Sequence, residues 1–172
     1  MKNDRDYDKE LMDTEKRQYA YNFDIDVMHK YMLKSFDPFL NRGNALELGC
    51  ALGDFTSRLL TRFDHVHCVE ASEKASKTLK ERFGKKITVY NDIFEKVQLN
   101  SRFENIFMTH VLEHLDDPVS VLKRVKEDWL TNQGRFFLVC PNANAPSRQL
   151  AVRMGIISHN AAVTEGEREH GH

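Results

Sequence analysis

Short apolar runs alternate with segments of helical periodicity along most of this 172-residue chain. Runs with the length and composition of strands occur at 45–48, 65–69, 87–90, 103–109 and 135–140. The segments between most of them carry apolar residues at helical spacing. Strands that alternate with helices favour a parallel sheet that is covered on both faces and wound right-handed. The sequence therefore predicts an α/β fold with a doubly wound sheet of about five parallel strands.

Capping residues mark where several helices begin and end. Ser72 can cap a helix that ends at Gly84. Asp117 precedes Pro118, which is favoured at the first position of a helix. Helices are also expected over 24–40, 54–63 and 146–154.

Composition divides the chain into three parts. Residues 1–23 are expected to form an N-terminal arm or lid, 24–155 the folded domain, and 156–172 a polar tail. The chain has 25 Lys and Arg against 26 Asp and Glu, which gives no general attraction to nucleic acid or to an anionic membrane. Its three cysteines are widely spaced without a CxxC pair, and no apolar run is long enough to span a membrane. These features predict a cytoplasmic protein.

The stretch from Leu46 to Thr56 reads as a strand, a glycine-punctuated turn and the start of a helix. Gly49 and Gly53 bracket the turn, with Cys50 and Ala51 between them. Parallel sheets bind ligands beyond the carboxyl ends of their strands, so this turn predicts a cradle for a small ligand.

Acidic residues follow the next two strands. Glu70 stands at the end of the second strand, where a carboxylate can accept both hydroxyls of a ribose. Asp92 follows the third strand and can take the exocyclic amine of adenine, with Ile93 against the base. These positions predict a nucleoside cofactor.

Two nucleoside cofactors fit this outline. A dinucleotide needs the GxGxxG spacing, but Ala51 occupies the position of its middle glycine. Glu47 is also a poor neighbour for a diphosphate. A carboxylate there suits a cofactor with an ammonium group and a sulfonium, which favours S-adenosylmethionine.

These motifs together resemble the class I S-adenosylmethionine-dependent methyltransferases, and most of all the small-molecule group with ubiquinone-biosynthesis-type enzymes. The matching segments lie at 46–53, 69–72, 91–93, 110–118 and 138–142. The resemblance implies methyl transfer to an oxygen, nitrogen or carbon atom of a small molecule. It also implies a set of cofactor-binding residues: Tyr21, Glu47, Gly49, Cys50, Ala51, Gly53, Glu70, Ala71, Asp92, Ile93 and His110.

The chain departs from this family in two ways. The family usually has Gly where Ala51 stands. Its Rossmann-like sheet has seven strands, of which the last two form an antiparallel pair, and the chain stops where this pair should begin. We therefore expect a truncated form with weak or no activity, and an exposed sheet edge through which two copies can pair.

The segment His110–His114 leaves three interpretations open. Glu113 and His114 can orient the loop and cap nearby helices. Alternatively, His114 is a catalytic general base that takes a proton from the acceptor. The third interpretation is a divalent metal site, which the partial match to a Glu-x-x-Glu-His run does not favour. All three assume that residues 110, 113 and 114 share one helical face.

Two further segments are candidates for contact with ligands. Tyr19, Tyr21 and Phe23 form either a lid over the cofactor or ordinary helix packing. Asn142, Ser147 and Arg148 follow the fifth strand and are candidates to touch the acceptor. The alternative functions are an inactive cofactor-binding domain, an NAD-dependent oxidoreductase, and an RNA or protein methyltransferase.

Overall fold

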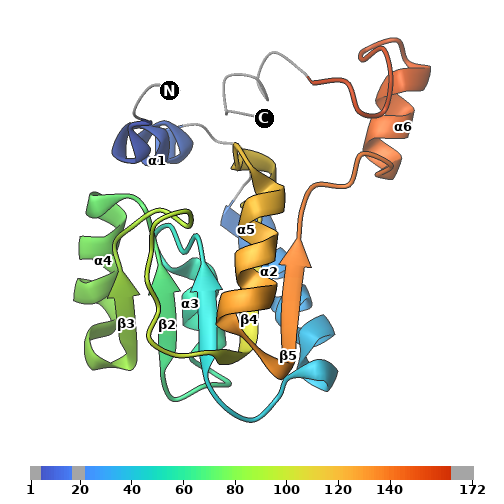
Figure 1. Ribbon diagram of the computed structural model, residues 1–172. Coiled ribbons are helices and arrows are strands. Elements are labelled where there is room, and N and C mark those ends of the chain that lie inside the picture. Colours follow the sequence, from blue (N-terminus) through green and yellow to red (C-terminus); the bar gives the residue numbers. More distant parts are fainter. Residues whose placement is uncertain (1–4, 17–21, 164–172) are drawn as a thin grey trace.

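The computed structural model describes residues 5–16 and 22–163 of the chain. Within these residues, five parallel strands form one sheet in the order β3-β2-β1-β4-β5. The strands are β1 (Ala45–Leu48), β2 (Val66–Val69), β3 (Ile87–Tyr90), β4 (Phe103–Thr109) and β5 (Leu130–Val139). This arrangement confirms the predicted α/β fold, and all five carboxyl ends point the same way (Figure 1).

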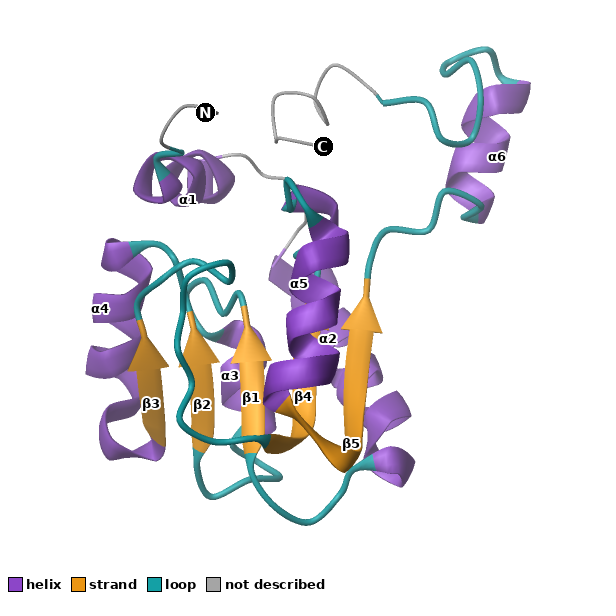
Figure 2. Cartoon of the chain, viewed as in Figure 1, coloured by secondary structure: helices purple, strands orange, loops and turns teal. Residues whose placement is uncertain are grey.

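Helices cover both faces of the sheet (Figure 2). One face carries α2 (Asn22–Phe36), α3 (Asp54–Leu59) and α4 (Glu73–Phe83), and the other carries α5 (Pro118–Arg124). A π-helical turn over Val125–Trp129 extends α5. The remaining helices are α1 (Tyr7–Lys16), α6 (Pro146–Arg153) and three short 3-10 turns at 37–39, 84–86 and 112–114.

Two apolar clusters hold these layers together. Phe107 of β4 stacks on Phe137 of β5 beneath α2 and α3, with ring centroids 4.8 Å apart. On the opposite face, Trp129 and Val121 pack on Ile106. The two faces of the central strand β1 are buried, as a parallel strand covered by helices requires. The glycine turn that follows β1 is therefore anchored in the best-packed part of the domain.

The predicted caps are confirmed. The Ser72 hydroxyl accepts the Ala75 N–H at 3.0 Å, and the Asp117 carboxylate accepts the Ser120 N–H at 3.0 Å. Gly84 ends α4 with a φ of 54°.

Several predicted boundaries were wrong. The helix expected over 24–40 ends at Phe36, and the helix expected over 54–63 ends at Leu59. The fifth strand, expected over 135–140, begins at Leu130 and includes Gly134. A Cβ on Gly134 would lie 2.7 Å from the Leu130 side chain and 3.0 Å from the Phe103 carbonyl oxygen. The glycine therefore permits a close approach inside the strand, at an irregularity in the β4–β5 register.

The described part of the sheet has β3 and β5 at its edges. α6 follows β5 and extends away from the sheet (Figure 1). Pairing of two copies through the β5 edge stays a prediction. Within 5–16 and 22–163, none of the helices has the length and apolar character needed to cross a membrane.

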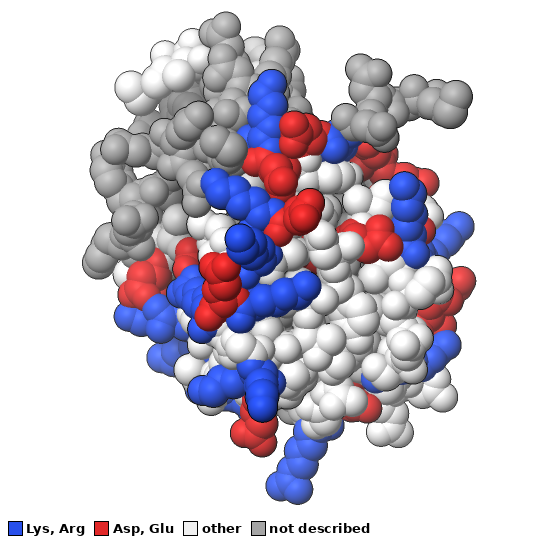
Figure 3. Space-filling view, turned by 90° about the vertical axis from the view of Figure 1, so that its left-hand side faces the viewer, with Lys and Arg blue, Asp and Glu red and all other residues white. Residues whose placement is uncertain are grey.

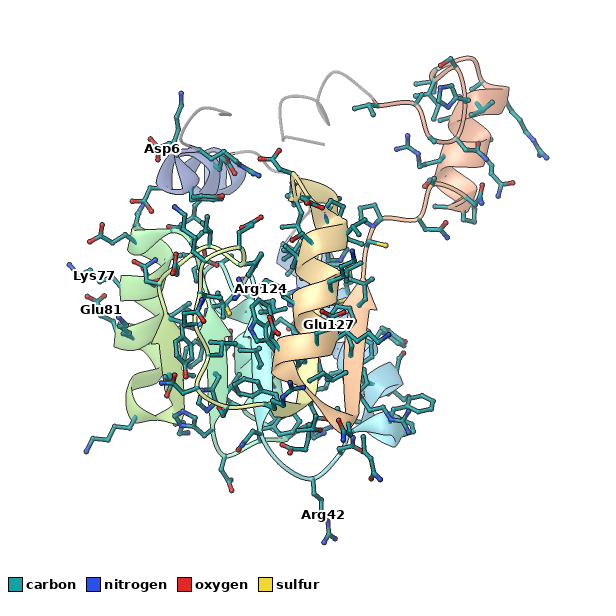
Figure 4. The ribbon with its side chains drawn as sticks, in the orientation of Figure 1. Asp6, Arg42, Lys77, Glu81, Arg124 and Glu127 are labelled. Atoms are coloured by element: carbon teal, nitrogen blue, oxygen red, sulfur yellow. The ribbon has the colours of Figure 1, made fainter. Side chains whose placement is uncertain are left out.

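Charged side chains are mixed on the face that carries α4. Lys77 and Glu81 lie one turn apart there, and both are exposed (Figure 4). Figure 3 shows Lys and Arg side chains interspersed with Asp and Glu over this side of the molecule. The view shows no continuous basic stripe, which is the usual electrostatic footprint of nucleic-acid binding.

Candidate active site

The glycine turn after β1 adopts left-handed backbone conformations at three positions. The φ angles are 76° at Gly49, 45° at Ala51 and 86° at Gly53. Side chains also crowd the glycines: an added Cβ would lie 2.5 Å from Val111 at Gly49, and 2.5 Å from Phe83 at Gly53. Glycine is thus needed at both positions for conformation and for space. Glycine would also suit position 51, because Ala51 has a left-handed backbone conformation as well.

Glu70 ties this turn to the start of α4. One carboxylate oxygen accepts the Ala51 N–H at 2.8 Å, and the other accepts the Ser72 N–H at 2.9 Å. Burial raises the pKa of Glu70, and the backbone hydrogen bonds from Ser72 and Ala51 oppose the rise. Each carboxylate oxygen keeps a second lone pair, so Glu70 can still accept hydroxyl groups from a ligand.

Glu47 lies beneath the turn and is 1% exposed. Its carboxylate accepts the Thr56 hydroxyl at 2.6 Å. Burial raises the pKa of Glu47 to about 8, although the hydrogen bonds from Thr56 and Cys50 oppose the rise. The sequence placed Glu47 next to the turn but did not reveal Thr56 as its partner. The two residues lie nine positions apart, in β1 and in α3, and only the fold brings the Thr56 hydroxyl to the buried acid.

Two acidic or amide side chains follow β3. The Asn91 amide donates to the carbonyl oxygens of Glu70 and Ala71, at 2.9 and 3.1 Å. Asp92 accepts the N–H of Ile93 at 2.8 Å. These hydrogen bonds join the segments that follow β2 and β3, and Asp92 and Ile93 lie at the same end of the parallel strands as Glu70.

The segment after β4 is not the single helical turn that was expected. His110 has a φ of 55°, and a 3-10 turn covers Leu112–His114. His110 Nδ1 still lies 3.7 Å from Glu113 Oε1. Val111, between them, is the residue that packs against Gly49. The assumption that residues 110, 113 and 114 share one helical face was therefore wrong, although His110 and Glu113 do meet.

The electrostatics of this segment favour an ionised Glu113. Burial opposes its ionisation, but His110, the backbone and His114 outweigh burial and lower the pKa of Glu113. His29 of α2, which no sequence motif singles out, lies close enough to interact with His110. Burial lowers the pKa of His29, while Asp54 opposes this effect. Its helical position gave no signal that it would face the carboxyl end of β4.

The N-terminal helix α1 lies across the carboxyl ends of β2 and β3 (Figure 1). Asp8 accepts the Ser72 hydroxyl at 2.5 Å and the Lys74 N–H at 3.1 Å. Arg5 donates to the His114 carbonyl oxygen at 2.7 Å. Residues 5–16 thus contact the segments after both β2 and β4.

Not every predicted residue joins this site. Tyr19, Tyr21 and the side chain of Phe23 lie outside the part of the chain that the structure describes. Arg148 of α6 donates to the carbonyl oxygens of Asn160 and Ala162 in the segment that follows this helix. In the part of the chain that the structure describes, the three-donor cluster suited to a metal is Glu47, Cys50 and Cys68, buried below the turn.

The chain matches known methyltransferases in sequence. Residues 46–136, from β1 into β5, match a protein family described as a methyltransferase domain. The chain belongs to this family. An uncharacterized methyltransferase of Bacillus cytotoxicus, Bcer98_3087, is 24% identical over 128 residues, which are 68% of this chain and 60% of that protein.

Solved methyltransferase structures share the fold. The DhpI-SAM-HEP complex aligns with a TM-score of 0.66 at 15% identity, over 84% of this chain and 66% of DhpI. The plantazolicin methyltransferase BpumL aligns with a TM-score of 0.64 at 11% identity, over 94% of this chain and 60% of BpumL. The chain thus spans about 60% of the length of the curated relative and 60–66% of these two structures.

Proposed function

We propose that this chain binds S-adenosylmethionine and transfers its methyl group to a small molecule. The observation that carries the proposal is the contact between Glu70 and the Ala51 N–H. It fixes a buried carboxylate against a left-handed glycine turn at the carboxyl ends of two central strands. This is the place where a doubly wound sheet binds a nucleoside.

The charge of the site favours this cofactor over a dinucleotide. The acidic side chains of Glu70 and Asp92 follow β2 and β3, and Asp54 begins α3. An acid in the first turn of α3 occupies the helix end that a diphosphate would need. S-adenosylmethionine has no phosphate, and its sulfonium and ammonium groups are cationic.

We assign the parts of the cofactor accordingly. Glu70 would accept the ribose hydroxyls, with Ala71 beside it, and Asp92 and Ile93 would take the adenine. Gly49, Cys50, Ala51 and Gly53 would hold the methionine half, with Glu47 beneath it and Tyr21 alongside, and His110 would face the methyl group, which S-adenosylhomocysteine lacks. When bound, the cofactor supplies an electrophilic methyl carbon on a good leaving group, and the protein aligns and desolvates the acceptor. The fold relatives DhpI and BpumL, whose structures are described with SAM and SAH, support this choice.

The acceptor atom and the role of His114 stay predictions. A small acceptor agrees with the near-neutral charge of the chain. Three free cysteines, of which Cys50 and Cys68 are buried, suit a reducing compartment such as the cytoplasm.

Isothermal calorimetry tests the proposal. Titration with S-adenosylhomocysteine should give one binding event per chain, and titration with NAD should give none. Glu70→Gln should weaken S-adenosylhomocysteine binding by roughly 10- to 100-fold, because a hydrogen bond to a charged group contributes about 1.5–3 kcal/mol. Glu73→Gln, on the exposed start of α4, is the matched control and should bind like the wild type. Binding of NAD in place of S-adenosylhomocysteine would contradict the proposal.

A further inference from the structure

Two buried polar atoms at the carboxyl end of β4 lack hydrogen-bond partners. Among the described residues, the buried side-chain nitrogen and oxygen atoms without a partner are His110 Nε2 and Glu113 Oε2. A buried polar atom that is left unpaired costs about 1–3 kcal/mol, so such atoms are rare and call for an explanation. Both occur in one side-chain pair, and a ligand that pairs with them would remove the cost.

The backbone of the same pair is also strained. His110 has a φ of 55°, and a non-glycine residue in this region costs of order 1–3 kcal/mol. The neighbouring structure holds it in place: the His110 N–H donates to the Val139 carbonyl oxygen at 2.8 Å, and Val111 packs on Gly49. The backbone of His110 is therefore fixed between the glycine turn and β5, next to the proposed methyl donor.

Glu113 determines which nitrogen of the His110 imidazole carries the proton. Its Oε1 lies 3.7 Å from His110 Nδ1, and a carboxylate there favours a proton on Nδ1. Nε2 is then the nitrogen that carries a free lone pair. Hydrogen bonds between catalytic groups are often long without a substrate and shorten once it binds.

The other ionisable groups around the pair come from four parts of the chain. His114 lies on the same segment, and its positive charge would favour an ionised Glu113. His29 approaches from α2, and Asp54 at the start of α3 faces His29. Arg5 reaches this segment from the N-terminal side and contacts the His114 carbonyl oxygen. Of the groups named here, only the His110–Glu113 pair has unpartnered buried atoms.

We propose that His110 is the general base of the reaction and that Glu113 positions it, so that the acceptor is a molecule with a proton-bearing oxygen or nitrogen. This inference rests on the proposed methyl transfer. As the acceptor atom bonds to the methyl carbon, the electron pair of the broken carbon–sulfur bond stays on sulfur. His110 Nε2 takes the proton that the acceptor O–H or N–H loses, and the Glu113 carboxylate stabilises the resulting imidazolium. Where the acceptor carries a second O–H or N–H, Glu113 Oε2 accepts a hydrogen bond from it.

Imidazole NMR of the free protein labelled with ¹⁵N-histidine tests the pair without any cofactor. The His110 signals, identified by their loss in His110→Asn, should show a neutral ring with its proton on Nδ1. Glu113→Gln should shift this tautomer toward Nε2–H, whereas His114→Asn should leave it unchanged. Asn tolerates the left-handed conformation, so His110→Asn is expected to fold. A proton on Nε2 in the wild type, or no response to Glu113→Gln, would overturn the proposal.

Ligand titrations then test whether the proton of an acceptor reaches His110 Nε2. In protein saturated with S-adenosylhomocysteine, phenol should move the His110 Nε2 resonance, and anisole, its methylated and proton-free counterpart, should not. His110→Asn should keep the affinity for S-adenosylhomocysteine within about twofold, that is within about 0.4 kcal/mol. A tenfold or greater loss would make His110 a cofactor ligand instead, and equal shifts with phenol and anisole would also overturn the proposal. Failure of the wild type to bind S-adenosylhomocysteine would refute the methyltransferase function while leaving the NMR result on the pair intact.

Discussion

Replacing Glu47 by Gln should change how the stability of the protein depends on pH. Glu47 is fully buried, and burial raises its pKa from 4.5 in the unfolded chain to about 8 in the folded protein. Between these two values the folded protein binds a proton that the unfolded chain has lost. The free energy of unfolding therefore falls as the pH rises through this window. Gln cannot ionise, and its carbonyl oxygen can still accept the Thr56 hydroxyl.

The size of the effect follows from the shift. A pKa difference of 3.5, from 4.5 to about 8, corresponds to roughly 5 kcal/mol of stability lost between the two values, at about 1.4 kcal/mol per pH unit. Glu70 is also buried with a raised pKa and adds to the slope of the wild type. The difference between Glu47→Gln and the wild type isolates the contribution of Glu47.

Urea unfolding from pH 5 to pH 8 measures this difference. The two proteins should be nearly equal in stability at pH 5, and the variant should be the more stable by a margin that grows toward pH 8. Glu73→Gln, at an exposed acid, should run parallel to the wild type at every pH. A difference between Glu47→Gln and the wild type that does not change with pH would refute the argument from burial.

Three further predictions concern the turn, the sheet face and the N-terminal helix. Ala51→Gly should raise the free energy of unfolding by about 1 kcal/mol in urea titrations, since Ala51 has a φ of 45°, whereas Ala75→Gly in α4 should lower it by about 1 kcal/mol or more. Arg124 (Figure 4) donates to the Phe94 and Val97 carbonyl oxygens, and its guanidinium lies 4.9 Å from the centre of the Trp129 ring. Arg124→Lys should therefore lower the free energy of unfolding by roughly 1–3 kcal/mol in the same titrations. A loss no larger than that of Lys123→Ala would contradict this. Asp8→Ala should speed amide hydrogen exchange in residues 5–16 but not in α5, because Asp8 joins α1 to Ser72 and Lys74. The hydrogen bond from the Ser72 hydroxyl is the largest cause that lowers the pKa of Asp8, so this contact should also weaken as the pH falls below 3.8, the ordinary pKa of the group. Unchanged exchange would exclude Asp8 as the residue that holds α1 in place.

Much of the fold was predictable because its signals are local. The strands β1, β3 and β4 match their predicted bounds, and Ser72 and Asp117 cap the helices they were expected to cap. The start of β5 was predicted wrongly because a glycine that precedes a strand and a glycine that admits a neighbouring side chain inside a strand look the same in sequence. Only the approach of Leu130 distinguishes them.

The candidate site was predictable where strand ends define it. Parallel strands bring Glu70 and Asp92 to one edge of the sheet, so their neighbourhood follows from topology. The partners of these side chains depend on loop conformations that no periodicity encodes. The left-handed backbone of His110, the approach of His29 from α2 and the bond between Glu47 and Thr56 are of this kind.

A crystal structure of the chain with S-adenosylhomocysteine tests the central claim most directly. Both ribose hydroxyls should lie on the Glu70 carboxylate and the adenine amine on Asp92. The homocysteine part should lie over the turn from Gly49 to Gly53. A ligand bound elsewhere, or bound at this turn without contact to Glu70, would contradict it.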